Sequence, residues 1–174
     1  DVNDAVWLAD LLAHGLIRPS FVPPAAVQEL RSLTRTRKQF VRERSAHVQR
    51  IDKVLEDANL KLGVVLADIM GVSGRAVLQA LIAGEHDPQR LVLLISTRGH
   101  VTAHHRFMLK LHLGHIDALD QAIAAIEKEV GQGLEPFRQA ARLLSTMPGL
   151  SNVSAQVVVA EIGIDMSRFA TPAH

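Results

Sequence analysis

The sequence predicts a mainly α-helical chain built around a long antiparallel coiled-coil hairpin with a small helical insert. Residues 25–62 contain neither Gly nor Pro, and apolar residues recur there at heptad spacing from Val27 to Leu62. A second heptad run extends from Leu109 to Val130. The residues between the two runs, 63–99, are interrupted by glycines and a proline, which favours short helices over one long one. The two runs are therefore expected to pair, with residues 63–99 as the insert.

The seam of the predicted hairpin is uneven. Its a and d positions are Val27, Leu30, Val41, Val48, Ile51, Leu55, Ala58 and Leu62 in the first run, and Leu109, His112, Ile116, Leu119, Ile123, Ile126 and Val130 in the second. Thr34, Arg37 and Arg44 interrupt the first run. We expect weak pairing in this basic half and tight pairing toward its end. Pairing of the same seams between two chains is the alternative arrangement.

Shorter helices are expected on both sides of the hairpin. Residues 4–14 form an apolar helix that Gly15 ends, and prolines in 18–24 mark a boundary. Residues 131–133 (Gly-Gln-Gly) are predicted as a hinge before helices at 134–145 and 152–162. The domains are thus expected at 1–24, 25–131 and 132–174.

The turn between the last two helices has a possible chemical role. Pro148 and Gly149 form a tight turn, and Ser151 is a suitable N-cap. The layout resembles a helix-hairpin-helix, in which N–H groups at the start of the second helix bind a phosphate and Gly149 lets the backbone approach. An ordinary αα-turn uses the same residues, and this stretch alone favours it.

Composition excludes several classes of protein. The chain has no Cys, so it has neither disulfides nor a thiolate metal site, which suits the cytoplasm. No apolar run reaches the ~18 residues of a membrane span. Aromatic residues make up 3% of the chain, too few for a base-stacking platform.

Basic residues are concentrated in the first heptad run. Eight of them and two acids lie between Arg31 and Lys53, although the whole chain carries a net charge of only +1. A stripe of this density is typical of polyanion binding, and a solvated helix face is the alternative. The candidate nucleic-acid-binding residues are Arg31, Arg35, Arg37, Lys38, Arg42 and Arg44, together with Gly149 and Ser151 in the turn.

Two acids open the chain. Asp1 and Asp4 lie three residues apart and share a helix face, so both carboxylates are able to reach one divalent ion. On spacing alone, a role in satisfying the free N–H groups of a first helical turn is favoured. Two further clusters are weaker metal candidates: histidines at 100–115, of which His100 and His104 lie one turn apart, and the pair Glu161 and Asp165.

Three stretches in this order resemble one protein family. Residues 1–12 (DVNDAVWLADLL) resemble the end of the first domain of the DEDD transposases of the IS-110, IS-116 and IS-902 insertion-sequence family. The basic helix from Leu30 resembles the family's central coiled coil, and residues 147–169 resemble the start of its C-terminal transposase domain. One departure is that Ser151 stands where the family usually has a second Gly in the turn.

The resemblance implies a function for the longer protein. The first domain would have an RNase H-like fold, of which residues 1–24 are the tail, and Asp1 and Asp4 would be the last two of four Mg²⁺-binding catalytic acids. The other two acids and a nucleophilic serine would lie outside this chain, which has no initiator Met and would not catalyse alone. DNA and a structured guide RNA are the implied partners, in a bacterial cytoplasm, with a homo-oligomer formed through the coiled coil.

The sequence therefore favours a fragment of a transposase that cuts and rejoins DNA by Mg²⁺-dependent phosphoryl transfer. Two alternatives from other classes stay open. One is a non-catalytic coiled-coil protein that binds nucleic acid, and the other is a helical scaffold with no polyanion partner.

Overall fold

The chain is helical throughout the part that the structure describes. The structure, a computed structural model, describes residues 2–17, 22–60, 62, 68–85 and 100–168, and this part contains no strand. The helices are α1 (Val2–Ala13), α2 (Ala25–Asp57), α3 (Val72–Ala83), α4 (Ala103–Gly133), α5 (Arg138–Ser145) and α6 (Asn152–Ile162), with short 3₁₀ turns at Glu135–Phe137 and Met166–Arg168. The predicted mainly α-helical class is confirmed.

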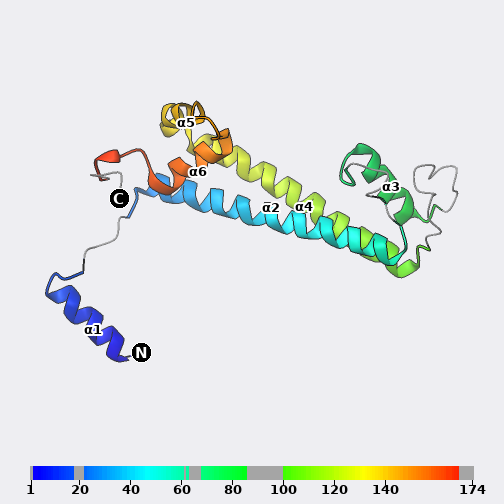
Figure 1. Cartoon of the computed structure of the whole chain (residues 1–174), viewed down its shortest axis with the longest axis horizontal. Coiled ribbons are helices and arrows are strands. Elements are labelled where there is room, and N and C mark those ends of the chain that lie inside the picture. The colour runs from blue at the N-terminus through cyan, green and yellow to red at the C-terminus, as the bar shows by residue number, and fades with distance from the viewer. Residues whose placement is uncertain (1, 18–21, 61, 63–67, 86–99, 169–174) are drawn as a thin grey trace.

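The two long helices, α2 and α4, lie side by side and run in opposite directions (Figure 1). Arg37 contacts Glu127, and Arg44, further along α2, contacts Asp120, which is earlier in α4. Residue numbers increase along α2 in the direction in which they decrease along α4, so the two helices are antiparallel. The two heptad runs pair within one chain. Helix α3, in the predicted insert, packs on the first turns of α4, at the end of the hairpin where α2 ends and α4 begins; this is called the far end below.

Local residues explain where α2 and α4 begin and end. α2 ends at Asp57, before the predicted Leu62, because Asn59 has a left-handed backbone with φ of 58° and Leu60 N–H donates to Leu55 O over 2.8 Å. α4 begins at a capping box, in which Thr102 Oγ1 accepts from the backbone N–H of His105 over 3.3 Å.

The predicted hinge at 131–133 is wrong, because α4 continues through both glycines to Gly133. Each glycine weakens a helix by only about 1 kcal/mol relative to Ala, and buried Val130 holds this last turn in the core. The helix instead stops before Pro136, which starts the 3₁₀ turn. The helix predicted from Leu134 is consequently shorter and begins at Arg138.

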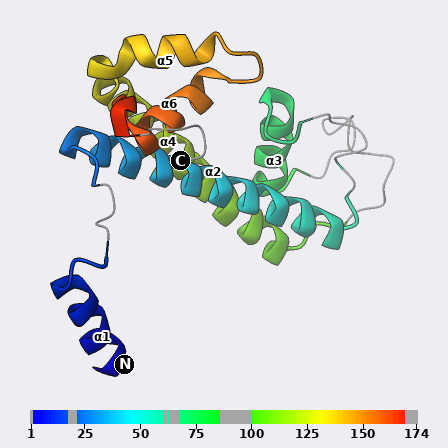
Figure 2. The same cartoon turned by 60° about the vertical axis from the view of Figure 1, so that its left-hand side comes forward.

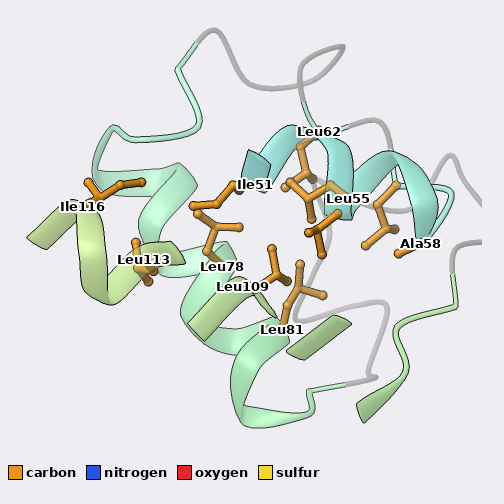
Figure 3. Packing of buried hydrophobic residues seen from close by; sticks show 11 residues of the cluster. Ile51, Leu55, Ala58, Leu62, Leu78, Leu81, Leu109, Leu113 and Ile116 are labelled. Carbon is orange, nitrogen blue, oxygen red and sulfur yellow. The ribbon is translucent and has the colours of Figure 1, made fainter. Parts of the chain in front are cut away.

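The apolar core is divided between the two ends of the hairpin. Figure 3 shows the cluster at the far end, where Ile51 and Leu55 of α2 meet Leu78 of α3 and Leu109 of α4. The second cluster, at the other end, joins α2 and α4 to α6 and consists of Leu30, Val130, Leu134, Val159 and Ala160. Between them the charged pairs Arg37–Glu127 and Arg44–Asp120 cross the seam, and Val41, which was predicted to lie in it, is 39% exposed.

Helix α1 stands apart from this helical body in both views (Figures 1 and 2). It has no buried residue, and its large apolar side chains Val6, Trp7, Leu8 and Leu12 are each more than half exposed. Gly15 follows it with φ of +67°, as predicted for a left-handed helix end. No described helix is both long and apolar enough to cross a membrane.

Candidate nucleic-acid interface

Two of the six basic candidates on α2 point into the hairpin. Arg37 donates from Nε and Nη2 to Glu127 Oε1 of α4 over 3.0 and 2.6 Å. Arg44 donates from Nε to Asp120 Oδ1 over 2.5 Å. These residues interrupted the predicted seam, and each interruption is matched by an acid on α4. The positive charges of Arg37 and Arg44 are therefore paired with carboxylates of the same chain.

Asp120 also binds the insert. Arg75 of α3 donates to Asp117 and, over 3.4 Å, to Asp120. One carboxylate is thus shared by Arg44 and Arg75, whose side chains are 32% and 28% exposed. Because this network joins α2, α3 and α4, it fixes where α3 sits on the long helices.

Arg31 and Arg35 hold α6 against α2. Arg31 donates to the backbone carbonyls of Ala160 and Glu161 over 3.3 and 2.5 Å, at the end of α6 where helix carbonyls lack intrahelical partners. Arg35 makes a bidentate pair with the Glu161 carboxylate, with both distances 2.8 Å. The hydrogen bond from Arg35 is the main cause that lowers the pKa of Glu161, and the same bond raises the pKa of Arg35. Glu161 stays ionised as a partner for both arginines.

Lys38 and Arg42 are the candidates that remain directed outward. They lie one turn apart on the exposed face of α2 and form no ion pair with another described residue. Both border a groove of about 720 Å³ between α2 and α6, whose wall includes Val41, Val153 and Val157. The exposed face of α2 continues at helical spacing to Lys53.

Arg35 separates this groove from a second hollow. The second hollow, of about 590 Å³, is lined by Arg31 and Arg35 and by neutral polar side chains that include Gln28 and Gln39. No acidic side chain lines it among the described residues. The start of α2 thus carries a basic surface on both sides of Arg35.

The turn candidates, Gly149 and Ser151, are exposed. Gly149 has φ of +86°, a conformation that favours glycine, and Ser151 Oγ accepts from the backbone N–H of Ser154 over 3.1 Å. Ser151 is the N-cap of α6, as expected. Phosphate binding at this turn stays a prediction.

The acidic candidates do not form a metal site in the described part of the chain. Asp1 lies outside the described residues, and Asp4 is exposed in the first turn of α1. No group of three or more His, Asp or Glu among the described residues is arranged to hold an ion. Glu161 is engaged by arginines, and Asp165 accepts from Ser167 N and Oγ over 3.1 and 2.6 Å.

A histidine cluster was missed in part by the sequence analysis. His47 of α2 joins His112 and His115 of α4: its Nδ1 lies 3.1 Å from His112 Nδ1, and its ring stacks on His115 with centroids 4.8 Å apart. Arg50 Nη1 lies 3.5 Å from His47 Nε2. The heptad register placed His112 in the seam, but only the pairing of α2 with α4 reveals that His47 faces it.

Arg50 disfavours a charged form of this cluster. Its guanidinium can only donate, so a neutral His47 whose Nε2 accepts suits the contact with Arg50. Burial is the first cause that lowers the pKa of His47 and of His112, with nearby positive charge, including that of Arg50, adding to it.

Comparison with known proteins gives one match. Residues 1–60 match the IS110-type DEDD transposase family, which is described as a transposase. No curated protein matches. No solved structure matches either. The resemblance inferred from the sequence is thus confirmed over residues 1–60, which span α1 and α2, while that of residues 147–169 stays a prediction.

Proposed function

We propose that this chain, whose first 60 residues match the IS110 family of DEDD transposases, belongs to an enzyme that cuts and rejoins DNA during transposition. The family match carries the proposal. Residues 147–169, which resemble the start of the family's C-terminal domain, lie beyond the matched segment and support it further. The proposed organisation is the tail of an RNase H-like domain at 1–24, the hairpin with its insert at 25–131, and the start of the C-terminal domain at 132–174.

The proposed metal ligands are Asp1 and Asp4, as half of a four-carboxylate Mg²⁺ site. Carboxylate oxygens are the donors that Mg²⁺ prefers, so Asp4 suits the ion chemically, and further acids from the catalytic domain would complete the set. Bound Mg²⁺ would supply charge neutralisation at the reacting phosphate. In the chain itself, α1 presents Asp4 on its first turn and offers an apolar face for packing.

A substitution in the full-length enzyme tests this assignment. Asp4→Asn keeps the size of the side chain and removes its charge, so excision and strand joining are expected to be lost. Asp10→Asn on the same helix is the matched control and should keep activity. If Asp4→Asn retains activity, Asp4 is only a helix-start residue.

The proposed nucleic-acid contacts are centred on the exposed face of α2. Lys38 and Arg42 are free to meet phosphates of DNA or of a structured guide RNA, and Arg35 is mostly exposed beside them. Arg31, Arg37 and Arg44 are held in internal ion pairs, so they would act by fixing α6 and α4 in place. Such phosphate contacts position a nucleic acid without specifying its sequence. Gly149 and Ser151 stay proposed as a further phosphate contact at the turn.

A salt titration tests the α2 surface. The double substitution Lys38→Ala and Arg42→Ala should weaken DNA binding and reduce the log–log salt slope by about 0.9 for each lost phosphate contact. Lys110→Ala with Lys128→Ala, which removes two exposed lysines of α4, is the control and should change neither quantity as much. Equal losses in both double variants would mean that binding is diffuse, with no interface on α2.

One observation favours a second candidate function, a helical scaffold without a polyanion partner. Four of the six basic candidates on α2, namely Arg31, Arg35, Arg37 and Arg44, are used in ion pairs that hold the helices together. If the Lys38 and Arg42 substitutions leave DNA affinity unchanged, the stripe is structural and the scaffold is the better assignment. In either case the joining of protomers through the helical region, which the family resemblance implies, stays a proposal beside the pairing of the two heptad runs within one chain.

A further inference from the structure

One acid lies within the basic surface of α2. Glu161, one residue before the end of α6, accepts two hydrogen bonds from Arg35, each over 2.8 Å. Its Oε2 also lies 3.3 Å from Arg31 Nε, and Lys38 attracts its charge from farther away. Among the described residues that line the groove between α2 and α6, Glu161 is the only acid, and four cations line the same groove. A nucleic acid that binds this surface must therefore approach a negative charge.

Arg35 is the cation that Glu161 occupies most fully. Its Nε and Nη2 donate side by side to the two carboxylate oxygens, and a guanidinium offers the same pair of donors to a phosphate. The Arg35 side chain is 65% exposed and borders both the groove and the second hollow, whose described lining includes no acid. A phosphate is thus able to reach Arg35 from solvent.

Arg31 allows the Arg35 pair to break without releasing α6. It donates to the backbone carbonyls of Ala160 and Glu161, and these bonds do not use the Glu161 carboxylate. If Arg35 turns to a phosphate, that carboxylate keeps Arg31 as a partner. The pair that is given up is exposed, and exposed ion pairs contribute little to stability because water and salt screen them. The exchange therefore costs little within the chain.

We propose that Glu161 occupies the place of a nucleic-acid phosphate on Arg35 in the free chain, and that a backbone phosphate displaces it when nucleic acid binds. The inference rests on the proposed binding surface at Lys38 and Arg42 and adds the regulation of that surface. Arg35, Lys38 and Arg42 follow one another at spacings of three and four on α2, so they share a helix face. A backbone held by Lys38 and Arg42 presents a neighbouring phosphate to Arg35 at high effective concentration.

Glu161→Gln in the 174-residue chain tests the exchange. It removes the competing charge and keeps the size of the side chain, so the affinity for a DNA duplex should rise about threefold. Glu29→Gln is the matched control, because Glu29 is an exposed acid of α2 that lines neither the groove nor the second hollow. It should raise the affinity less. Equal gains in the two variants would mean that Glu161 acts only through net charge, which overturns the proposal.

A double-mutant cycle isolates the contribution of Arg35. In an Arg35→Ala chain there is no guanidinium to free, so the gain from Glu161→Gln should fall to that from Glu29→Gln. A gain of the same size with and without Arg35 contradicts the exchange.

The side-chain Nε–H signal of Arg35 in nuclear magnetic resonance gives a measurement that needs no change at Glu161. It is identified by its loss in Arg35→Ala and should shift when DNA is added. The signal of Arg31 should shift less, because Arg31 stays on the carbonyls of α6. An Arg35 signal that does not move at saturating DNA overturns the proposal, even if Glu161→Gln fails to fold.

An RNA duplex of the same sequence distinguishes the two sources of phosphate. A larger gain from Glu161→Gln than from Glu29→Gln with either duplex supports the exchange and identifies that nucleic acid as a ligand of Arg35. If the wild type binds and neither duplex shows this difference, only the exchange is contradicted. Absence of binding by the wild type and by Glu161→Gln contradicts the nucleic-acid proposal as well.

Discussion

At the residue scale, the hairpin places two histidines next to each other and beside a permanent positive charge. His47 Nδ1 lies 3.1 Å from His112 Nδ1, and Arg50 Nη1 lies 3.5 Å from His47 Nε2. His115 stacks on His47 from α4, while Glu43 on α2 is the nearby acid that favours the charged form. Burial and positive charge prevail and keep the pKa of both His47 and His112 low.

Stability should therefore fall in mild acid. In the unfolded chain each histidine titrates near the ordinary histidine pKa of about 6.5, and in the folded chain the pKa of both rings is lower. As the pH drops below about 6.5 the unfolded state binds protons that the folded state does not, so the unfolding free energy decreases; above that pH the full stability is present. Denaturant unfolding between about pH 5 and 8 measures it.

Two variants show whether this pH dependence comes from the buried cluster. His112→Leu fills the buried seam position with an apolar side chain and removes one titrating ring, so the pH dependence should shrink. His104→Gln removes an exposed histidine and should leave it unchanged. If the unfolding free energy of His112→Leu depends on pH as strongly as that of the wild type, the pH dependence comes from other groups.

Gly114 gives a second prediction at the residue scale. Gly114→Ala should raise the unfolding free energy of the monomer by about 0.5–1 kcal/mol, because alanine is the better helix former and its Cβ enters open space. Thermal unfolding of the variant and of the wild type measures the change.

Gly131→Ala is the matched variant for this experiment. Gly131 also lies in α4 with open space around its Cβ position, but it lies in the last turn of the helix. Gly131→Ala should raise the unfolding free energy less than Gly114→Ala, because helix ends fray. An equal gain in both variants would mean that the position along α4 does not matter.

At the element scale, α6 is held to α2 by two arginines of unequal importance. Arg31 is 25% exposed and satisfies two carbonyls at the end of α6, whereas Arg35 is 65% exposed and makes only side-chain contacts. Arg31→Met should lower the unfolding free energy by about 1.5–3 kcal/mol, because charged hydrogen bonds to partly buried carbonyls are lost. Arg35→Met should lower it less, since water screens an exposed pair.

Chemical denaturation of the two variants measures the difference. Added salt should reduce the difference in unfolding free energy between the wild type and Arg35→Met more than the difference between the wild type and Arg31→Met. Equal losses, or a larger loss in Arg35→Met, would mean that the carbonyl contacts contribute little.

Also at the element scale, the heptad periodicity predicted where the helices lie better than it predicted which side chains contact each other between them. The heptad spacing predicted α2 and α4, because Leu30, Ile51 and Leu109 recur with the helix and are buried. It did not show that Arg37 and Arg44 would find acids on α4, since partners depend on the register between helices. The Gly131 hinge failed because tertiary packing of Val130 outweighed a local propensity. The candidate interface was likewise predicted as a stripe, while its division into paired and outward residues required the positions of Glu127, Asp120 and Glu161.

At the scale of the whole molecule, the hairpin has two apolar ends joined by a polar middle. The far cluster holds α3, and the near cluster holds α6. Between them Arg37 and Arg44 are matched to α4 by charge, which specifies register where apolar contacts are few. The α2–α4 pair therefore acts as a spacer that holds the basic surface near one end and the insert at the other.

Helix α1 is independent of this body, which leads to a prediction about truncation. It buries no residue, and the body's first anchored positions come after it, where Pro23 is buried and its carbonyl accepts from Gln28 Nε2 over 2.7 Å. A chain that begins at Val22 should keep its unfolding free energy within about 0.5 kcal/mol of the 174-residue chain, the range of surface changes. It should also be more soluble, because the exposed Trp7 and Leu12 are removed. Denaturant unfolding measures the unfolding free energy, and light scattering measures aggregation. A loss of more than about 2 kcal/mol in the unfolding free energy would mean that α1 packs on the hairpin.

Under the proposed function α1 instead packs on the catalytic domain. In the full-length enzyme Trp7→Ala should therefore lower the stability of that domain while leaving the unfolding of the hairpin unchanged.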